Sequence, residues 1–168
     1  MMKTRKTFAI LFVIAALLCM AAAAYAADSA NQTVTFEVQA INDITVSDSS
    51  VNLVINSVTA GGALEPATDS STTYSVTTNE EGKKITAGID TVMPTGTALS
   101  VELASSKATS AGEVDISNAT TGAEVDVVTG LSKCTDSAQT ITYTFSATPE
   151  AGTVSGTKTV TFTITDAA

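Results

Sequence analysis

The sequence predicts an all-β protein, an Ig-like antiparallel β-sandwich, and three observations support this fold class. Apolar residues alternate with Ser and Thr over segments of six to eight residues, which is typical of half-buried strands. Ser and Thr make up 45 of the last 142 residues, and in the strictly alternating segments Thr residues lie between apolar positions. Turn-forming residues separate these segments, and none of the segments has the periodicity of an amphipathic helix.

The first 26 residues predict a secretory signal peptide. Basic residues at Lys3, Arg5 and Lys6 precede an apolar run at 8–26 that ends in Ala-Tyr-Ala, the usual order of such a leader. The run is also just long enough to span a bilayer, so an uncleaved anchor is an alternative. A lipoprotein at Cys19 is disfavoured because Leu18 precedes it. We expect cleavage after Ala26, one domain over residues 27–168 and no further membrane span.

The clearest strands are expected where alternation is strict, at Thr33–Ala40, Thr140–Phe145 and Thr159–Thr165. Their β-branched residues suit a pleated sheet and disfavour a helix. Further strands are expected at Asp43–Ser47, Val51–Asn56, Thr72–Thr78, Lys84–Ile89, Thr97–Leu103, Glu113–Ser117 and Glu124–Leu131. The polar segments Thr59–Ser71 and Ala104–Ala111 are interpreted as solvated loops, with binding loops as the alternative.

Charge and composition exclude several classes of function. After the leader the chain has 17 acidic residues and only five Lys, so its net charge is −12. It has no His and no Arg, which removes His-based nucleophile pairs, His metal ligands and Arg phosphate clamps. Nucleic acid is not expected as a partner because its binding requires clustered basic residues. No cofactor is expected.

Cys134 and two pairs of carboxylates are the remaining candidates for chemistry. A lone Cys cannot close an intramolecular disulfide, and Cys134 is interpreted as a small buried residue, with an intermolecular disulfide as the alternative. Each carboxylate pair has a spacing of two and so shares one strand face; the pairs are Glu113 with Asp115 and Glu124 with Asp126. Such pairs suit calcium or acid–base chemistry, but a solvated acidic face is favoured.

The first strand after the leader is unusual because it is apolar and close to a free end. Its apolar face carries Val34, Phe36, Val38 and Ala40. An extended segment of this kind pairs either within its own domain or with the sheet of another subunit, where main-chain bonds give affinity and alternate side chains fill slots. The strand pattern alone favours pairing within its own domain, with pairing to another subunit as the alternative.

Two segments resemble known secreted β-proteins. Residues Asn31–Val46 resemble the start of colonisation-factor-type pilins of the chaperone–usher class. Residues Pro149–Ile164 are similar to the last turn and strand of fimbrial and spore-coat-type β-domains. The resemblance implies a sandwich completed by the N-terminal strand of the next subunit. In this chain the donor segment would be residues 27–41, with Val34, Phe36, Val38 and Ala40 as the contact residues.

We therefore expect a secreted structural subunit of a fimbria-like filament on the bacterial surface, with an adhesive or matrix-forming role. It would form a polymer with copies of itself, with an assembly chaperone as a further partner. Two other hypotheses stay open. One is a monomeric carbohydrate- or protein-binding module that uses its loops. The other is an enzyme that uses the paired carboxylates, which we consider the weaker of the two.

Overall fold

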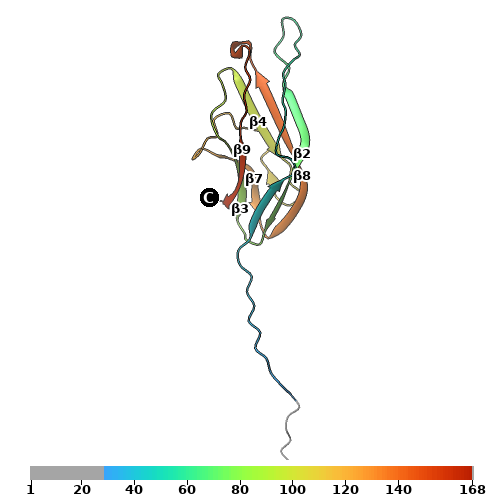
Figure 1. Ribbon diagram of the computed structural model, residues 1–168, viewed down its shortest axis with the longest axis vertical. Helices are drawn as coiled ribbons and strands as arrows, with labels where there is room; N and C mark the ends of the chain where they lie inside the picture. The colour runs from blue at the N-terminus through green and yellow to red at the C-terminus, as the bar shows by residue number, and fades with distance from the viewer. Residues whose placement is uncertain (1–28, 168) are drawn as a thin grey trace, which may run out of the picture. The chain divides into compact units, whose positions relative to one another are not determined.

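The computed structural model describes residues 29–167, which contain nine β-strands arranged in two antiparallel sheets (Figure 1). One sheet has the strand order β1-β2-β8-β4-β6, and the other has the order β5-β7-β3-β9. The strands are β1 (Asn42–Val46), β2 (Ala67–Thr78), β3 (Lys83–Ile89), β4 (Thr97–Leu103), β5 (Thr109–Ser110), β6 (Val114–Asp115), β7 (Val125–Leu131), β8 (Cys134–Ala147) and β9 (Val160–Asp166). The predicted all-β sandwich is confirmed.

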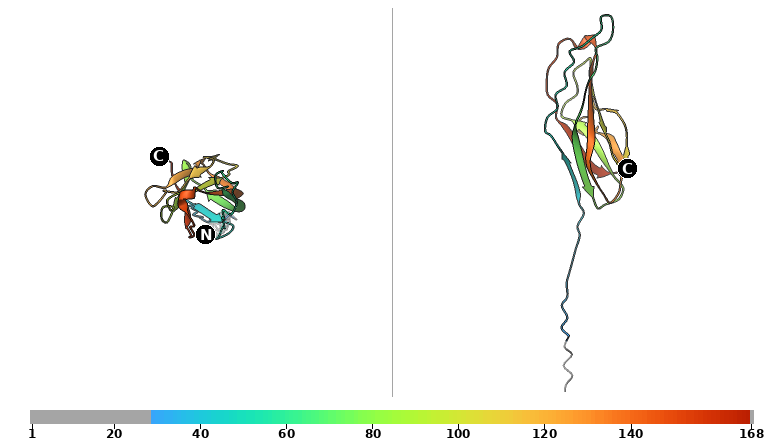
Figure 2. Two further views of the ribbon diagram at one scale, coloured as in Figure 1. Left: turned by 90° about the horizontal axis from the view of Figure 1, so that it is seen from above. Right: turned by 90° about the vertical axis from the view of Figure 1, so that its right-hand side faces the viewer.

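The hydrophobic core lies between the two sheets, which form two facing layers (Figure 2). The strands of the five-stranded sheet contribute Tyr74, Val76, Leu99, Val101, Leu103 and Ile141, all buried. The strands of the four-stranded sheet contribute Ile85, Ala87, Ile89, Val127, Val128 and Leu131. Strand β4 has the bounds that its alternation predicts, with three apolar side chains directed inward and polar ones between them. Alternation thus decides which face each strand buries.

Strand β7 interrupts this alternation because Val127 and Val128 are both fully buried. Their partner strand explains the exception. Ile85 on β3 lies opposite Val128, whereas the next residue, Thr86, lies opposite Asp126. Val127 therefore has no direct partner, and the strand has a β-bulge at this point. The extra residue turns both Val side chains into the core.

The structure differs from the expected element bounds in several places. Strand β5 lies inside the expected loop Ala104–Ala111, β6 is shorter than the expected Glu113–Ser117, and β8 is longer than the expected Thr140–Phe145. Residues 51–56 form no strand, although Val51, Leu53 and Ile55 are half-buried and alternate with exposed residues. The loop expected at Thr59–Ser71 ends early, because β2 already begins at Ala67 and pairs with β8. The segment Thr33–Ala40 is also assigned to no strand in the single chain. The strand pattern is present at residues 51–56 and 33–40 without a ladder, whereas residues 67–71 lack the pattern and begin a strand because they pair with β8.

The domain organisation expected from the sequence is a leader at residues 1–26 followed by one domain at residues 27–168. The leader at residues 1–26 lies outside the described residues. Among the described residues, those from Val38 onward form one compact unit that contains both sheets, and residues 29–37 lie outside this unit. The described part has one short 3₁₀ turn at Pro149–Ala151, where a turn was expected. No helix in this part has the length and hydrophobicity needed to cross a bilayer.

Candidate subunit interface

The four residues predicted to contact a neighbouring subunit lie at residues 29–41, which are assigned to no strand. Val34 is 72% exposed, Phe36 is 89% exposed and Val38 is 79% exposed. Ala40 is exposed as well. Single exposed apolar side chains are common on protein surfaces, but a row of them marks a surface that binds something. In an extended conformation all four point to the same face.

Burial of this row would release a substantial free energy. A fully buried Val or Phe side chain gains about 1.5–3 kcal/mol relative to water, so three of them would gain roughly 4–9 kcal/mol. Main-chain hydrogen bonds to a sheet edge would add to this. That total is comparable with the free energy that stabilises a whole domain. The segment therefore carries enough apolar surface to hold two subunits together, given a matching edge.

Strand β9 provides such an edge in the sheet-forming unit. It lies at one end of the four-stranded sheet and forms a ladder only with β3 among the described strands. Its inward side chains Val160, Phe162 and Ile164 pack against the core but are only half-buried. An edge strand exposes a row of backbone donors and acceptors that another strand can use.

The other edge strands of the two sheets are shorter than β9. Strands β5 and β6, at the opposite ends of the two sheets, have two residues each. Strand β1 has five residues and β9 has seven. Strands β1 and β9 approach each other without a ladder between them, and the inward residue Ile44 of β1 is also half-buried. The β1 and β9 side is therefore where the two sheets cover their core least completely.

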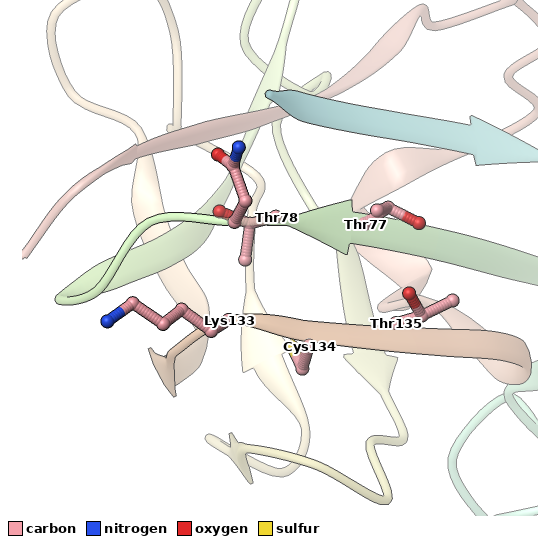
Figure 3. Close-up of a pocket in the computed structure, with 6 residues that line it drawn as sticks. Thr77, Thr78, Lys133, Cys134 and Thr135 are labelled. Carbon is pink, nitrogen blue, oxygen red and sulfur yellow. The ribbon is translucent and has the colours of Figure 1, made fainter. Parts of the chain in front are cut away.

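Cys134 is the first residue of β8, lies opposite Thr78 of β2, and is half-buried against the core. An open hollow of about 360 Å³ lies beside it (Figure 3). Its lining residues are Thr77, Thr78, Asn79, Lys133, Cys134 and Thr135. Lys133 occupies a tight turn with φ 41°, and its ammonium group is 2.6 Å from a carboxylate oxygen of Glu81. The nearest cation in sequence is thus paired with a carboxylate.

Three of the four paired carboxylates, those of Asp115, Glu124 and Asp126, hold turns or neighbouring strands. The Asp115 carboxylate accepts a hydrogen bond from the Ser117 amide at 2.7 Å. The Glu124 carboxylate accepts from backbone amides, its own and that of Gly122, and these bonds lower its pKa. Asp126 lies 2.9 Å from the Lys84 ammonium, beside a second open hollow of about 390 Å³. Within residues 29–167 no cluster of three or more His, Cys, Asp or Glu side chains is arranged to hold a metal ion.

Two residues with clear roles had no specific signal in the sequence. Asp136 is 2% exposed, and its carboxylate accepts hydrogen bonds from the hydroxyl groups of Ser105 and Ser106 and from the amides of Ser106 and Lys107. It therefore holds the 104–108 loop against β8. Asn79 lies in the turn between β2 and β3, and its side chain binds the backbone ahead of β1. Both roles depend on contacts between residues about 30 to 40 positions apart.

Comparison with known proteins adds no family: no protein-family model, curated protein or solved structure matches this chain.

Proposed function

We propose that this chain is a secreted structural subunit that polymerises by β-strand addition into a fimbria-like filament on the bacterial surface. The observation that carries the proposal is the exposed apolar row at Val34, Phe36 and Val38, together with the half-buried edge strand β9. The chain has both halves of a strand-addition contact. In this proposal its role is adhesive or matrix-forming, and no step of it is catalytic.

The proposed contact joins the segment at residues 29–41 of one copy to β9 of the next. The donated segment has seven residues from Val34 to Ala40, as many as β9 has from Val160 to Asp166. Its apolar residues would cover Phe162 and its neighbours, while Thr35 and Glu37 would face solvent. Because donor and acceptor are different surfaces, the contact is heterologous and builds an open filament instead of a closed ring.

An assembly chaperone is part of the same proposal. Before assembly, a subunit exposes the edge of β9, and exposed strand edges promote aggregation. A chaperone that pairs one of its own strands with this edge until assembly would prevent such aggregation.

The test compares two neighbouring substitutions that add the same charge to opposite faces of the donated segment. Phe36→Asp places a carboxylate in the buried row, whereas Thr35→Asp places one on the solvent face. The secreted chain and both variants are examined by size-exclusion chromatography and electron microscopy. We expect the unmodified chain and Thr35→Asp to form filaments and Phe36→Asp to remain monomeric.

The folding of the variants is checked by denaturant unfolding at concentrations below the onset of assembly, because assembly itself raises apparent stability. We expect the unmodified chain and both variants to have the same midpoint as monomers. The proposal fails if the unmodified chain remains monomeric at every concentration and forms no filament on cells. It also fails if Phe36→Asp assembles as well as Thr35→Asp. A permanently monomeric chain would instead favour the alternative, a monomeric carbohydrate- or protein-binding module.

A further inference from the structure

The side chain of Asn79 holds the backbone immediately ahead of β1. Its carbonyl oxygen accepts a hydrogen bond from the Ile41 amide at 2.8 Å. Its amide nitrogen donates to the carbonyl oxygen of Gln39 at 2.7 Å. The backbone amide of Asn79 donates to the carbonyl oxygen of Ile41 at 3.2 Å. We refer to these three bonds as the Asn79 clamp.

The clamp continues the β1–β2 ladder beyond the end of β2. The ladder pairs Asn42 with Thr78, the last residue of β2, after which the chain turns toward β3 through residues 79–82. The carboxamide of Asn has the same donor and acceptor as a peptide group. In the turn it takes the place of the missing strand backbone, and residues 39–41 are therefore held as an extension of β1.

Neighbouring groups fix the turn that carries the clamp. The hydroxyl group of Thr78 donates to the side-chain carbonyl of Asn42 at 2.7 Å, and the Asn42 amide donates to the Glu80 carboxylate. Glu80 in turn lies 3.0 Å from the ammonium group of Lys83. The start of β1 and the turn are thus connected at several points, so Asn79 is presented to the backbone in one orientation.

We propose that Asn79 is a positioning residue that prevents the apolar segment at residues 34–38 from folding back on its own sandwich, so that it is left for a second copy. The inference rests on the proposed function. To pair along β1, the chain would have to reverse direction at residues 39–41, and to reach β9 it would have to bend across to the other sheet. Either path breaks the bonds that Asn79 makes to Gln39 and Ile41.

The residue types at positions 39–41 also disfavour a reversal of the chain direction, independently of the clamp. A tight two-residue hairpin turn requires positive φ at its central residues, which favours Gly, Asn or Asp. The residues available at this point are Gln39, Ala40 and the β-branched Ile41. The clamp and the absence of a turn residue therefore both oppose folding of the segment onto its own sandwich. A single substitution at Asn79 removes the clamp and leaves the other feature unchanged.

The first measurement uses the folded monomer and does not depend on assembly. Asn79→Ala is compared with Asn52→Ala, a matched substitution at an exposed Asn outside the sheets. We expect the amide of Ile41 to exchange with solvent at least tenfold faster in Asn79→Ala and to be unchanged in Asn52→Ala. Amides of the β3 core strand serve as an internal reference for global stability. Equal Ile41 exchange in both variants would refute the clamp.

The second measurement is the fraction of secreted chain that remains monomeric under conditions in which the unmodified chain assembles. We expect this fraction to rise severalfold in Asn79→Ala and not in Asn52→Ala, because a segment that pairs with its own sandwich is not available for donation to another copy. If the unmodified chain and Asn79→Ala assemble equally, the inference is wrong while the proposed function stands. If the unmodified chain itself never assembles, the proposed function fails first.

Discussion

Phe162 of β9 lies directly opposite Ala87 of β3 in the antiparallel ladder of the four-stranded sheet. Ala87 is completely buried, whereas Phe162 is only half-buried. The difference follows from the position of the two strands. Strand β3 has a ladder partner on each side, and β9 has β3 alone among the described strands. The aromatic ring of Phe162 therefore marks the place where the core reaches the edge of the sandwich.

Phe162→Ser is expected to affect assembly more than folding. The ring is half-buried, so its removal should lower the unfolding free energy of the monomer by about 1–3 kcal/mol, less than the loss of a fully buried Phe. In the proposed filament the same ring is covered by the donated strand, and its removal should abolish assembly. Denaturant unfolding measures the first effect and size-exclusion chromatography measures the second.

The matched control for Phe162 is Thr161→Ala, which changes the exposed face of the same strand. It should leave both the unfolding free energy and the assembly unchanged. An assembly defect equal in Thr161→Ala and Phe162→Ser would contradict a contact that covers the inward side of β9.

Asp136→Asn is expected to lower stability at neutral pH and to reduce its dependence on pH. Burial opposes ionisation of this carboxyl, but its hydrogen bonds to Ser106, Ser105 and Lys107 together keep its pKa below the usual value. An Asn amide would place N–H groups against some of these donors, at a cost of about 2–4 kcal/mol.

The sign of the pH effect follows from the lowered pKa. The unfolded chain binds a proton at Asp136 near pH 3.9, its ordinary value, and the folded chain does so only at lower pH. The stabilising contribution of Asp136 is thus complete above about pH 4 and is lost as pH falls through the folded-state pKa. Thermal unfolding between neutral and acidic pH should show a shallower decline in Asp136→Asn. Parallel pH profiles for the two proteins would contradict this assignment.

Gly96→Ala is expected to destabilise the domain by roughly 2–4 kcal/mol. Gly96 has φ +78°, and a Cβ atom at this position would lie 2.6 Å from the backbone nitrogen of Ala151. The substitution therefore combines an unfavourable backbone conformation with a clash that no side-chain movement relieves. Gly156→Ala is the control, because its Cβ would meet nothing within 4 Å. Similar melting temperatures for both variants would show that the close approach is not retained in solution.

The alternation of apolar and polar residues was enough to predict most strands of this protein. Thr97–Leu103 was predicted with its observed bounds, and the segments that became β3, β7 and β9 were predicted to within one residue at each end. These predictions succeeded because a strand that faces a core on one side and water on the other has a period of two. The exposed positions of Val34, Phe36 and Val38 belong to the same pattern, but their partner does not appear in it.

Other features could not be read from local pattern. Val51–Asn56 alternates as a strand does but forms no ladder. Strand β8 begins at Cys134 and includes Asp136, a charged residue whose side chain is buried. A ladder requires a neighbour at the correct distance, and a buried carboxylate requires donors from a loop about 30 residues away. Sequence separation conceals both requirements.

Composition and periodicity therefore settled that this chain forms an all-β sandwich, because they reflect how each residue divides between core and water. The tertiary arrangement decided the rest: which strand is left at an edge, which carboxylate is buried, and that Asn79 meets Ile41. Those outcomes depend on long-range pairing, and pairing selects among many segments of similar local preference by hydrogen bonds and packing that exist only after the sheets have formed.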